Sequence, residues 1–172
     1  LVGSEMCIET AKKEITVKLD LIPLYVYGNP ALLSELVMNL LDNAVKYNRE
    51  NGQVEVALTK VDDRVVLTVS DTGIGIPEDK QERIFERFYR AEESRNKATG
   101  GSGLGLSICK HIVENHKGTL QISSKEGEGA TFIITLPAMS EKDVNEEETN
   151  EVLAKQEAAD GDSGKLAEIE AL

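Results

Sequence analysis

Asn39-Leu40-Leu41-Asp42-Asn43-Ala44-Val45-Lys46-Tyr47 is the stretch that decides the fold, and it lies in the second half of a predicted helix. The helix has a clear start, because Asn29 suits the N-cap and Pro30 suits the first helical position, where a missing N–H costs nothing. Apolar residues then recur at spacings of three and four, at Leu32, Leu33, Leu36, Val37, Leu40, Leu41, Ala44 and Val45. This pattern predicts an amphipathic helix that packs against a core.

A polar edge runs beside that apolar face. Asn39, Asn43 and Lys46 are spaced i, i+4, i+7, so their side chains align along the helix. Two amide oxygens and an ammonium group can together hold a hydrated divalent cation and a polyphosphate. The alternative is a solvated polar stripe on an ordinary amphipathic helix, and this stretch alone does not decide between the two.

Length and charge bound the domain organisation. With 172 residues and 40% hydrophobic content, the chain can bury one good core. The formal net charge is −12, but residues 140–172 contain eleven acidic and three basic residues and so carry −8 of it. The sequence has no basic stripe with interleaved aromatics, so we expect no nucleic-acid partner. We expect one domain over residues 1–138, followed by an acidic tail over 139–172 that is disordered or marginally helical.

The two cysteines and the hydropathy pattern indicate in which cellular compartment the chain is expected. Cys7 and Cys109 make no disulfide framework, and reduced thiols in a cytosolic protein are the simple interpretation. No apolar run is long enough to span a membrane, and the N-terminus is not a signal peptide. These features lead us to expect a cytoplasmic location without direct membrane contact. Because the chain begins with Leu1 rather than Met, we also expect a fragment of a longer protein, which can itself be membrane-anchored.

Helical and strand patterns alternate along the chain. Ser4 is a plausible N-cap for a first helix through Ala11, and Pro77 opens a short helix toward Phe85 and Phe88. Another helix is predicted from Leu104 to His116, ended by Gly118. Strands are predicted at 15–19, 24–27, 54–58, 65–69, 120–124 and 131–136. The order predicts a two-layer α/β sandwich, with helices on one face of a mixed, mostly antiparallel sheet.

Two glycine stretches can approach a ligand closely. Asp71-Thr72-Gly73-Ile74-Gly75-Ile76 follows a strand directly, so its carboxylate can accept a hydrogen bond from an exocyclic amine. Gly101-Ser102-Gly103-Leu104-Gly105-Leu106 enters a helix, where backbone N–H groups bind phosphate. The alternatives are an ordinary Asp/Gly turn and a flexible hinge. Neither stretch has the Gly-Lys-Ser/Thr ending of a P-loop or the G-x-G-x-x-G spacing of a dinucleotide site.

Taken in order, these motifs resemble the catalytic, ATP-binding domain of sensor histidine kinases, in the GHKL ATPase/kinase superfamily. The stretch from Asn39 to Tyr47 resembles the family's N-box. The stretches that begin at Asp71 and Gly101 resemble its two glycine boxes. The phenylalanine box resembles Phe85-Glu86-Arg87-Phe88-Tyr89-Arg90. Four boxes in the right order and spacing make a highly specific match. The resemblance implies a Bergerat-type sandwich that binds ATP and Mg²⁺.

The resemblance also implies roles at the phosphate end of the nucleotide. Asn43 would be the principal magnesium ligand, and Asn39 would support the metal–phosphate cluster. Lys46 and Arg90 would neutralise phosphate oxygens, so Asn39, Lys46 and Arg90 would be the catalytic residues. The second glycine stretch would bring its backbone toward the phosphates, with Gly101, Ser102, Gly103, Leu104, Gly105 and Leu106 in the binding site.

At the nucleoside end, the resemblance implies that Asp71 receives the adenine amine and that Tyr47 packs nearby. Gly73, Gly75 and Ile76 would form the adjoining wall, with the glycines keeping it open. The loop Ala91 to Gly100 would act as a lid hinged at its glycines. Phe85 and Phe88 would anchor that lid to the core.

The residue at position 39 bears on the reaction type. In related ATPases of the superfamily, the residue four before the metal-binding asparagine is a glutamate that activates water. Here it is Asn39, and a neutral amide cannot take a proton at physiological pH. The resemblance therefore implies transfer of the γ-phosphoryl group to another nucleophile. Glu35, one turn earlier, is expected either at the surface or behind the residues that contact the ligand. Asp42 points about 100° around the helix from Asn43.

No phosphoacceptor motif, a His followed by Glu or Asp and then Arg-x-Pro, occurs in the chain. His111 and His116 lie in the last predicted helix, and we assign neither a phosphate. The resemblance implies that the acceptor histidine lies on a dimerisation domain, upstream or on another chain, and that the parent protein serves a response regulator in two-component signalling. A nucleotide-binding interaction module without phosphotransfer is the alternative, and a dedicated ATPase is a third.

Overall fold

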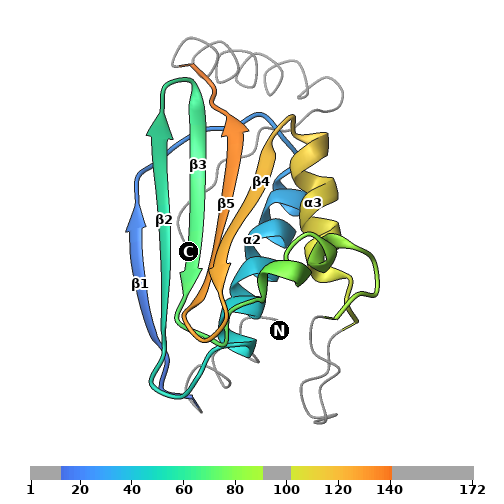
Figure 1. The fold of residues 1–172 in the computed structure, drawn as a ribbon. Coiled ribbons are helices and arrows are strands. Elements are labelled where there is room, and N and C mark those ends of the chain that lie inside the picture. The colour runs from blue at the N-terminus through green and yellow to red at the C-terminus, as the bar shows by residue number, and fades with distance from the viewer. Residues whose placement is uncertain (1–12, 91–101, 141–172) are drawn as a thin grey trace.

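The computed structural model describes residues 13–90 and 102–140. A five-stranded sheet has the order β1-β2-β3-β5-β4, in which β1 is parallel to β2 and the other neighbours are antiparallel. Its strands are β1 (Thr16–Leu21), β2 (Gln53–Val61), β3 (Arg64–Asp71), β4 (Thr119–Lys125) and β5 (Gly129–Pro137). Helices α2 (Pro30–Lys46) and α3 (Gly105–Asn115) both lie on one side of this sheet (Figure 1). The predicted two-layer α/β sandwich is confirmed.

The core lies between the sheet and the two helices. Along β2, the buried residues Val54 and Val56 alternate with an exposed Glu55, which is the period of a strand with one face on a core. Leu40 of α2 and Ile134 of β5 are both 0% exposed and belong to the same cluster. The apolar face expected of the central helix is therefore the face that packs on the sheet.

The start of α2 is fixed by side chains. The Asn29 side chain accepts hydrogen bonds from the N–H groups of Ala31 and Leu32, as predicted for the N-cap. His116 accepts the Asn29 N–H at Nε2 over 3.2 Å, and its Nδ1 lies 2.7 Å from the carbonyl of Ile112. These partners favour the tautomer with the proton on Nδ1. His116 thus connects the end of α3 to the start of α2.

Two predicted elements differ in the structure. Residues 24–27 form no strand: Val26 makes a single antiparallel bridge with Ala138. A proline and a glycine bracket this segment, which leaves too little chain for a ladder. The predicted helix after Pro77 is instead two short 3₁₀ helices, η1 (Glu78–Lys80) and η2 (Arg83–Phe85), neither of which has a side-chain cap.

The inner face of β1 is only partly covered. Leu19 pairs with Val56 and so shares its face of the sheet, yet Leu19 is 56% exposed and Val56 is 5% exposed. An apolar cavity of about 310 Å³ borders this region, lined by β1, the segment that follows it and α2. The helical layer therefore protects the centre of the sheet better than its β1 edge.

Among the described residues, no helix is both long enough and apolar enough to cross a membrane. The predicted helix at Ser4 to Ala11, the Ala91 to Gly100 lid and most of the acidic tail lie outside the described residues.

A matched pair of leucines tests this account of the core. Leu40→Ala should lower the free energy of unfolding by about 2–5 kcal/mol, because it leaves a cavity in the close-packed centre. Leu19→Ala should cost less than about 1 kcal/mol, because that side chain is already largely in water. Urea titration of both variants checks the difference, and equal losses would contradict the uncovered inner face of β1.

Cys109 provides a second test of the packing. Its thiol is fully buried where α3 packs on α2, 3.8 Å from the carbonyl of Leu36, and burial raises its pKa to about 12. Because the thiolate is the reactive form, Cys109 should resist iodoacetamide at pH 8 in the folded protein and react once urea unfolds it. Peptide mass spectrometry separates it from Cys7, and rapid labelling of native Cys109 would contradict the assignment.

Candidate functional site

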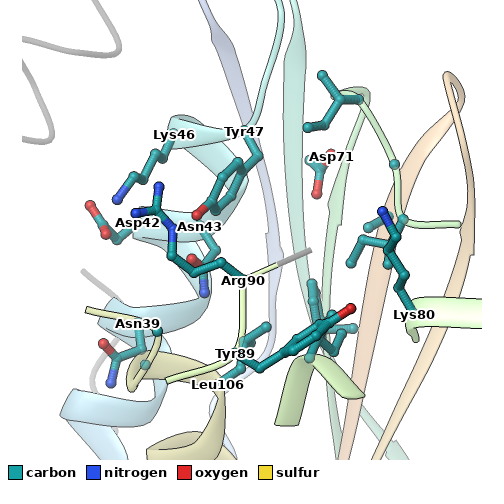
Figure 2. Close-up of a pocket in the computed structure, with 18 of the residues that line it drawn as sticks. Asn39, Asp42, Asn43, Lys46, Tyr47, Asp71, Lys80, Tyr89, Arg90 and Leu106 are labelled. Atoms are coloured by element: carbon teal, nitrogen blue, oxygen red, sulfur yellow. The ribbon is translucent and has the colours of Figure 1, made fainter. Parts of the chain in front are cut away.

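A cavity of about 310 Å³ opens at the C-terminal end of α2. It lies between that helix, the turn that follows β3, the 3₁₀ segment and the start of α3 (Figure 2). Its lining is Asn39, Asp42, Asn43, Lys46, Tyr47, Asp71, Ile74, Gly75, Ile76, Pro77, Lys80, Ile84, Tyr89, Arg90, Ser102, Gly103, Gly105, Leu106, Glu126, Ala130 and Phe132. The cavity thus brings together residues from all four motifs.

One wall of the cavity is polar and belongs to α2. Figure 2 shows Asn43, Lys46 and Arg90 grouped on this side, with Asn39 one turn away along the helix. The Asn39 Nδ2 group is buried and has no hydrogen-bond partner among the described residues. A buried donor left without a partner costs free energy, so it points to a ligand or to water.

The start of α3 approaches this wall closely. A Cβ added at Gly105 would lie 3.4 Å from Asn39 Oδ1 and 4.0 Å from Asn43 Nδ2, so this position is in van der Waals reach of both amides. Gly103 has a φ of +69°, and its carbonyl accepts the Phe88 N–H over 2.9 Å. The N–H groups at a helix start are available to anions. The arrangement therefore places a helix N-terminus beside two amides and two cations.

The opposite wall is the turn from Asp71 to Ile76. The Asp71 Oδ1 atom accepts the Gly73 N–H over 2.8 Å. Burial raises the pKa of Asp71, and the hydrogen bonds from the Gly73 and Ala130 backbone oppose that shift. In Figure 2 the carboxylate lies across the cavity from the α2 side chains.

The turn is tied to the end of α2. The Ile74 N–H donates to the Tyr47 carbonyl over 3.1 Å, and a Cβ at Gly73 would lie only 2.3 Å from the same oxygen. Gly73 is thus a packing residue behind the cavity and not part of its lining. Asn48, which is 7% exposed, accepts from the Thr72 hydroxyl and donates to the Gln53 carbonyl. Sequence reasoning missed this buried network.

Most predicted site residues border the cavity, but four do not: Gly73, Phe85, Phe88 and Leu104. Phe88 is 72% exposed and has a φ of +64°, so its predicted role as an anchor to the core is wrong. The positive φ turns the chain so that Tyr89 packs on the core beside Phe85 and lines the cavity. The Arg83 guanidinium lies 4.3 Å from the Tyr89 ring centroid. Gly101 lies outside the described residues.

The structure adds lining residues that the motifs did not reveal: Asp42, Ile74, Pro77, Lys80, Ile84, Tyr89, Glu126, Ala130 and Phe132. Asp42, Ile74 and Tyr89 lie inside recognised motifs, which was a usable signal. Glu126, Ala130 and Phe132 come from the β4–β5 hairpin, and nothing local in the sequence places that hairpin beside the turn.

The donor set limits the kind of metal site that fits. No group of three His, Cys, Asp or Glu side chains within residues 13–90 and 102–140 could hold a metal ion. A cation here would depend on amide oxygens, ligand oxygens and water. That donor set suits Mg²⁺, which keeps several waters and takes few protein ligands beside a phosphate.

Fold and cavity together define a two-layer α/β domain with a ligand site at one end of its sheet. The chain belongs to the histidine kinase-, DNA gyrase B-, and HSP90-like ATPase family, whose profile matches residues 28–140. The resemblance drawn from the four motifs is confirmed at this level.

Relatives and solved structures agree with this membership. The chain is 47% identical over 116 residues to the sensor histidine kinase RppB of Synechocystis, covering 67% of this chain and 26% of the relative. It is 44% identical over 118 residues to the sensor-like histidine kinase SenX3 of Mycobacterium tuberculosis, covering 69% and 29%. The chain therefore spans less than a third of these curated relatives.

Among solved structures, the mycobacterial sensor histidine kinase MprB superposes with a TM-score of 0.68 at 31% identity, covering 80% of this chain and 93% of that one. Full-length ShkA, solved in complex with AMPPNP, gives a TM-score of 0.67 at 29% identity, covering 81% and 29%. The fold of the described residues is thus that of histidine kinase catalytic domains.

The pKa of Asp71 leads to a stability prediction. Because its pKa is raised, the folded protein binds this proton more tightly than the unfolded chain, so stability falls as pH rises through the interval between the two pKa values. Asp71→Asn removes this cost and keeps an oxygen for the Gly73 N–H. The variant should therefore be at least as stable as the wild type at pH 7, with a smaller advantage at pH 4.

Urea unfolding at both pH values measures this difference, with the exposed Asp20→Asn as the matched control. A loss of stability in Asp71→Asn at pH 7 would contradict the assigned desolvation cost.

Proposed function

We propose that this domain binds Mg²⁺-ATP in the cavity and transfers the γ-phosphoryl group to a histidine on a separate dimerisation and phosphoacceptor domain. The observation that carries the proposal is the pairing of two walls: an amide-lined helix with an unpartnered buried donor, and a carboxylate across a cavity of about 310 Å³. Family membership and the named relatives support it.

At the nucleoside end, Asp71 would accept the adenine amine. One of its oxygens already accepts the Gly73 N–H, so the carboxylate is held in a fixed direction by its own turn. Ile76, Ala130 and Phe132 supply apolar surface on the same side, which suits a flat base. Desolvation strengthens a hydrogen bond to this carboxylate, because little water competes for it.

At the phosphate end, Lys46 and Arg90 would neutralise oxygens, and the backbone at Gly103 and Gly105 would donate N–H groups. Asn43 and Asn39 would turn their amide oxygens to the metal. When bound, Mg²⁺ would balance the charge on the terminal phosphates during transfer. The unpartnered Asn39 Nδ2 would then find an acceptor in a phosphate oxygen or in water.

The identity of the nucleophile separates kinase from hydrolase. Asn39 and Asn43 are neutral amides that cannot activate water, so they would only position and bind. Asp42 lines the same polar wall, however, and is the carboxylate nearest to Asn43 in the sequence. Its place favours dedicated ATP hydrolysis as the second candidate function.

The wider organisation follows from the same proposal. Residues up to 138 would fold as the catalytic unit, with the acidic tail from 139 as an appendage. The acceptor histidine and the response regulator would be reached through other parts of the parent protein. An interaction module that binds ATP without transferring phosphate is the alternative for this unit.

A transfer assay tests the proposal. The chain is mixed with ATP labelled at the γ-phosphate, Mg²⁺ and a dimerisation-helix fragment of its own parent protein. We expect acid-labile label on that fragment. Nucleotide binding without transfer would instead support the interaction module, and steady phosphate release without the fragment would support a hydrolase.

The metal assignment is tested by Asn43→Asp, which places a carboxylate beside the phosphates. We expect the variant to change the Mg²⁺ dependence of ADP binding by about tenfold or more, as judged by calorimetry with and without the metal. Asn115 in α3 is exposed, so Asn115→Asp is the control, and its Mg²⁺ dependence should match that of the wild type. Unchanged Mg²⁺ dependence in Asn43→Asp would count against Asn43 as a ligand.

A further inference from the structure

The β4–β5 hairpin packs backbone to backbone on the turn that carries Asp71. Its Gly127 N–H donates to the Ile74 carbonyl over 2.7 Å, and a Cβ at Gly75 would lie 2.0 Å from the Lys125 carbonyl oxygen. At the other end of the turn, a Cβ at Gly129 would lie 2.0 Å from the Asp71 carbonyl oxygen. With no room for a side chain at either contact, the hairpin sets where the turn lies.

One hydroxyl group connects the two contact regions. Ser124 Oγ accepts the Ile76 N–H over 2.9 Å and donates its proton to the Gly129 carbonyl over 2.7 Å. Ile76 is the last residue of the turn and lines the cavity, whereas Gly129 abuts Asp71 at its start. A single side chain therefore restrains both ends of the turn.

Gln81 holds the same residue, Ile76, at its carbonyl. Its Nε2 group donates to the Ile76 carbonyl over 3.0 Å and to the Ser124 carbonyl over 2.8 Å. The N–H of Ile76 is thus held by Ser124 and its C=O by Gln81. An amide group has two hydrogens, and both are used here.

We propose that Ser124 is a positioning residue for the adenine subsite, and that it holds the Asp71 carboxylate and the Ile76 wall at the spacing that an adenine base requires. The inference rests on the proposed function. Ser124 does not itself line the cavity, so it acts through Asp71 and Ile76. Without its hydroxyl, the Ile76 N–H and the Gly129 carbonyl lose their partner, and the turn can drift from the base.

The expected consequence is selective. Recognition of the adenine amine by Asp71 should weaken, whereas the phosphate end, which α2 and α3 form, should be unaffected. ADP and IDP separate the two, because they share the phosphates and ribose but IDP has a carbonyl where ADP has the amine. The ratio of the ADP and IDP dissociation constants therefore reports on how well Asp71 is placed. A general loss of folding would weaken the binding of both nucleotides and would not selectively change this ratio.

The test compares Ser124→Ala with Ser123→Ala, its neighbour on the same strand, which faces the other side of the sheet and is exposed. By calorimetry, Ser124→Ala should raise the Kd for ADP about tenfold and leave the Kd for IDP nearly unchanged. Tenfold is the scale expected from one lost hydrogen bond that leaves unpaired groups. Ser123→Ala should match the wild type. Ser124→Thr keeps the hydroxyl and should restore most of the preference for ADP.

Gln81→Leu is a second variant, which removes the hydrogen bond to the Ile76 carbonyl, and it should lower the preference for ADP in the same direction. It decides the question if Ser124→Ala fails to fold. An unchanged ADP-to-IDP ratio in a folded Ser124→Ala or Gln81→Leu protein would overturn the positioning role while leaving the proposed function intact. If the wild type binds no adenine nucleotide, the proposed function fails, and this inference fails with it.

Discussion

The structure depends on a close backbone contact between the end of α2 and the turn after β3. Gly73 lies so near the Tyr47 carbonyl that a Cβ would come within 2.3 Å of the oxygen, while the next N–H in the turn, that of Ile74, donates to it over 3.1 Å. The contact fixes the turn to the helix. It also brings the motif that carries Asp71 and the helix that carries Asn43 to a common cavity, although 28 positions separate them in the sequence.

The contact is supported by a buried hydrogen-bond network beside it. Asn48 is buried behind it and uses its amide to hold Gln53, while its oxygen accepts from both Arg49 and Thr72. A partly satisfied buried amide would destabilise this corner, whereas a satisfied one makes it rigid. Rigidity here matters, because a cavity between a helix and a turn keeps its width only if neither wall can move toward the other.

The sequence predicted best what depends on local periodicity. The polar edge of α2 follows from its helical spacing, and both amides do line the cavity. The mistake at Phe88 has a local cause that no spacing shows: a left-handed φ of +64° interrupts the pattern and turns Tyr89 inward instead. Lining residues such as Glu126 and Phe132 lie beyond such reasoning, because only the folded sheet brings the β4–β5 hairpin to the turn. The lid and the acidic tail stay predictions, since they lie outside the described residues.

The charged residues around the cavity differ between its two walls. Lys46 and Arg90 lie on the α2 side together with the carboxylate of Asp42, whereas the half-buried carboxylate of Asp71 lies across from them. A ligand with an anionic end and an amine at the other would meet two cations at one wall and a carboxylate at the other. The neutral amides Asn39 and Asn43 lie on the α2 wall itself. A carboxylate at position 39 would add negative charge beside a polyphosphate and would supply a base for water. An amide there avoids both effects, which agrees with the proposed transfer of the phosphoryl group to a nucleophile on another domain.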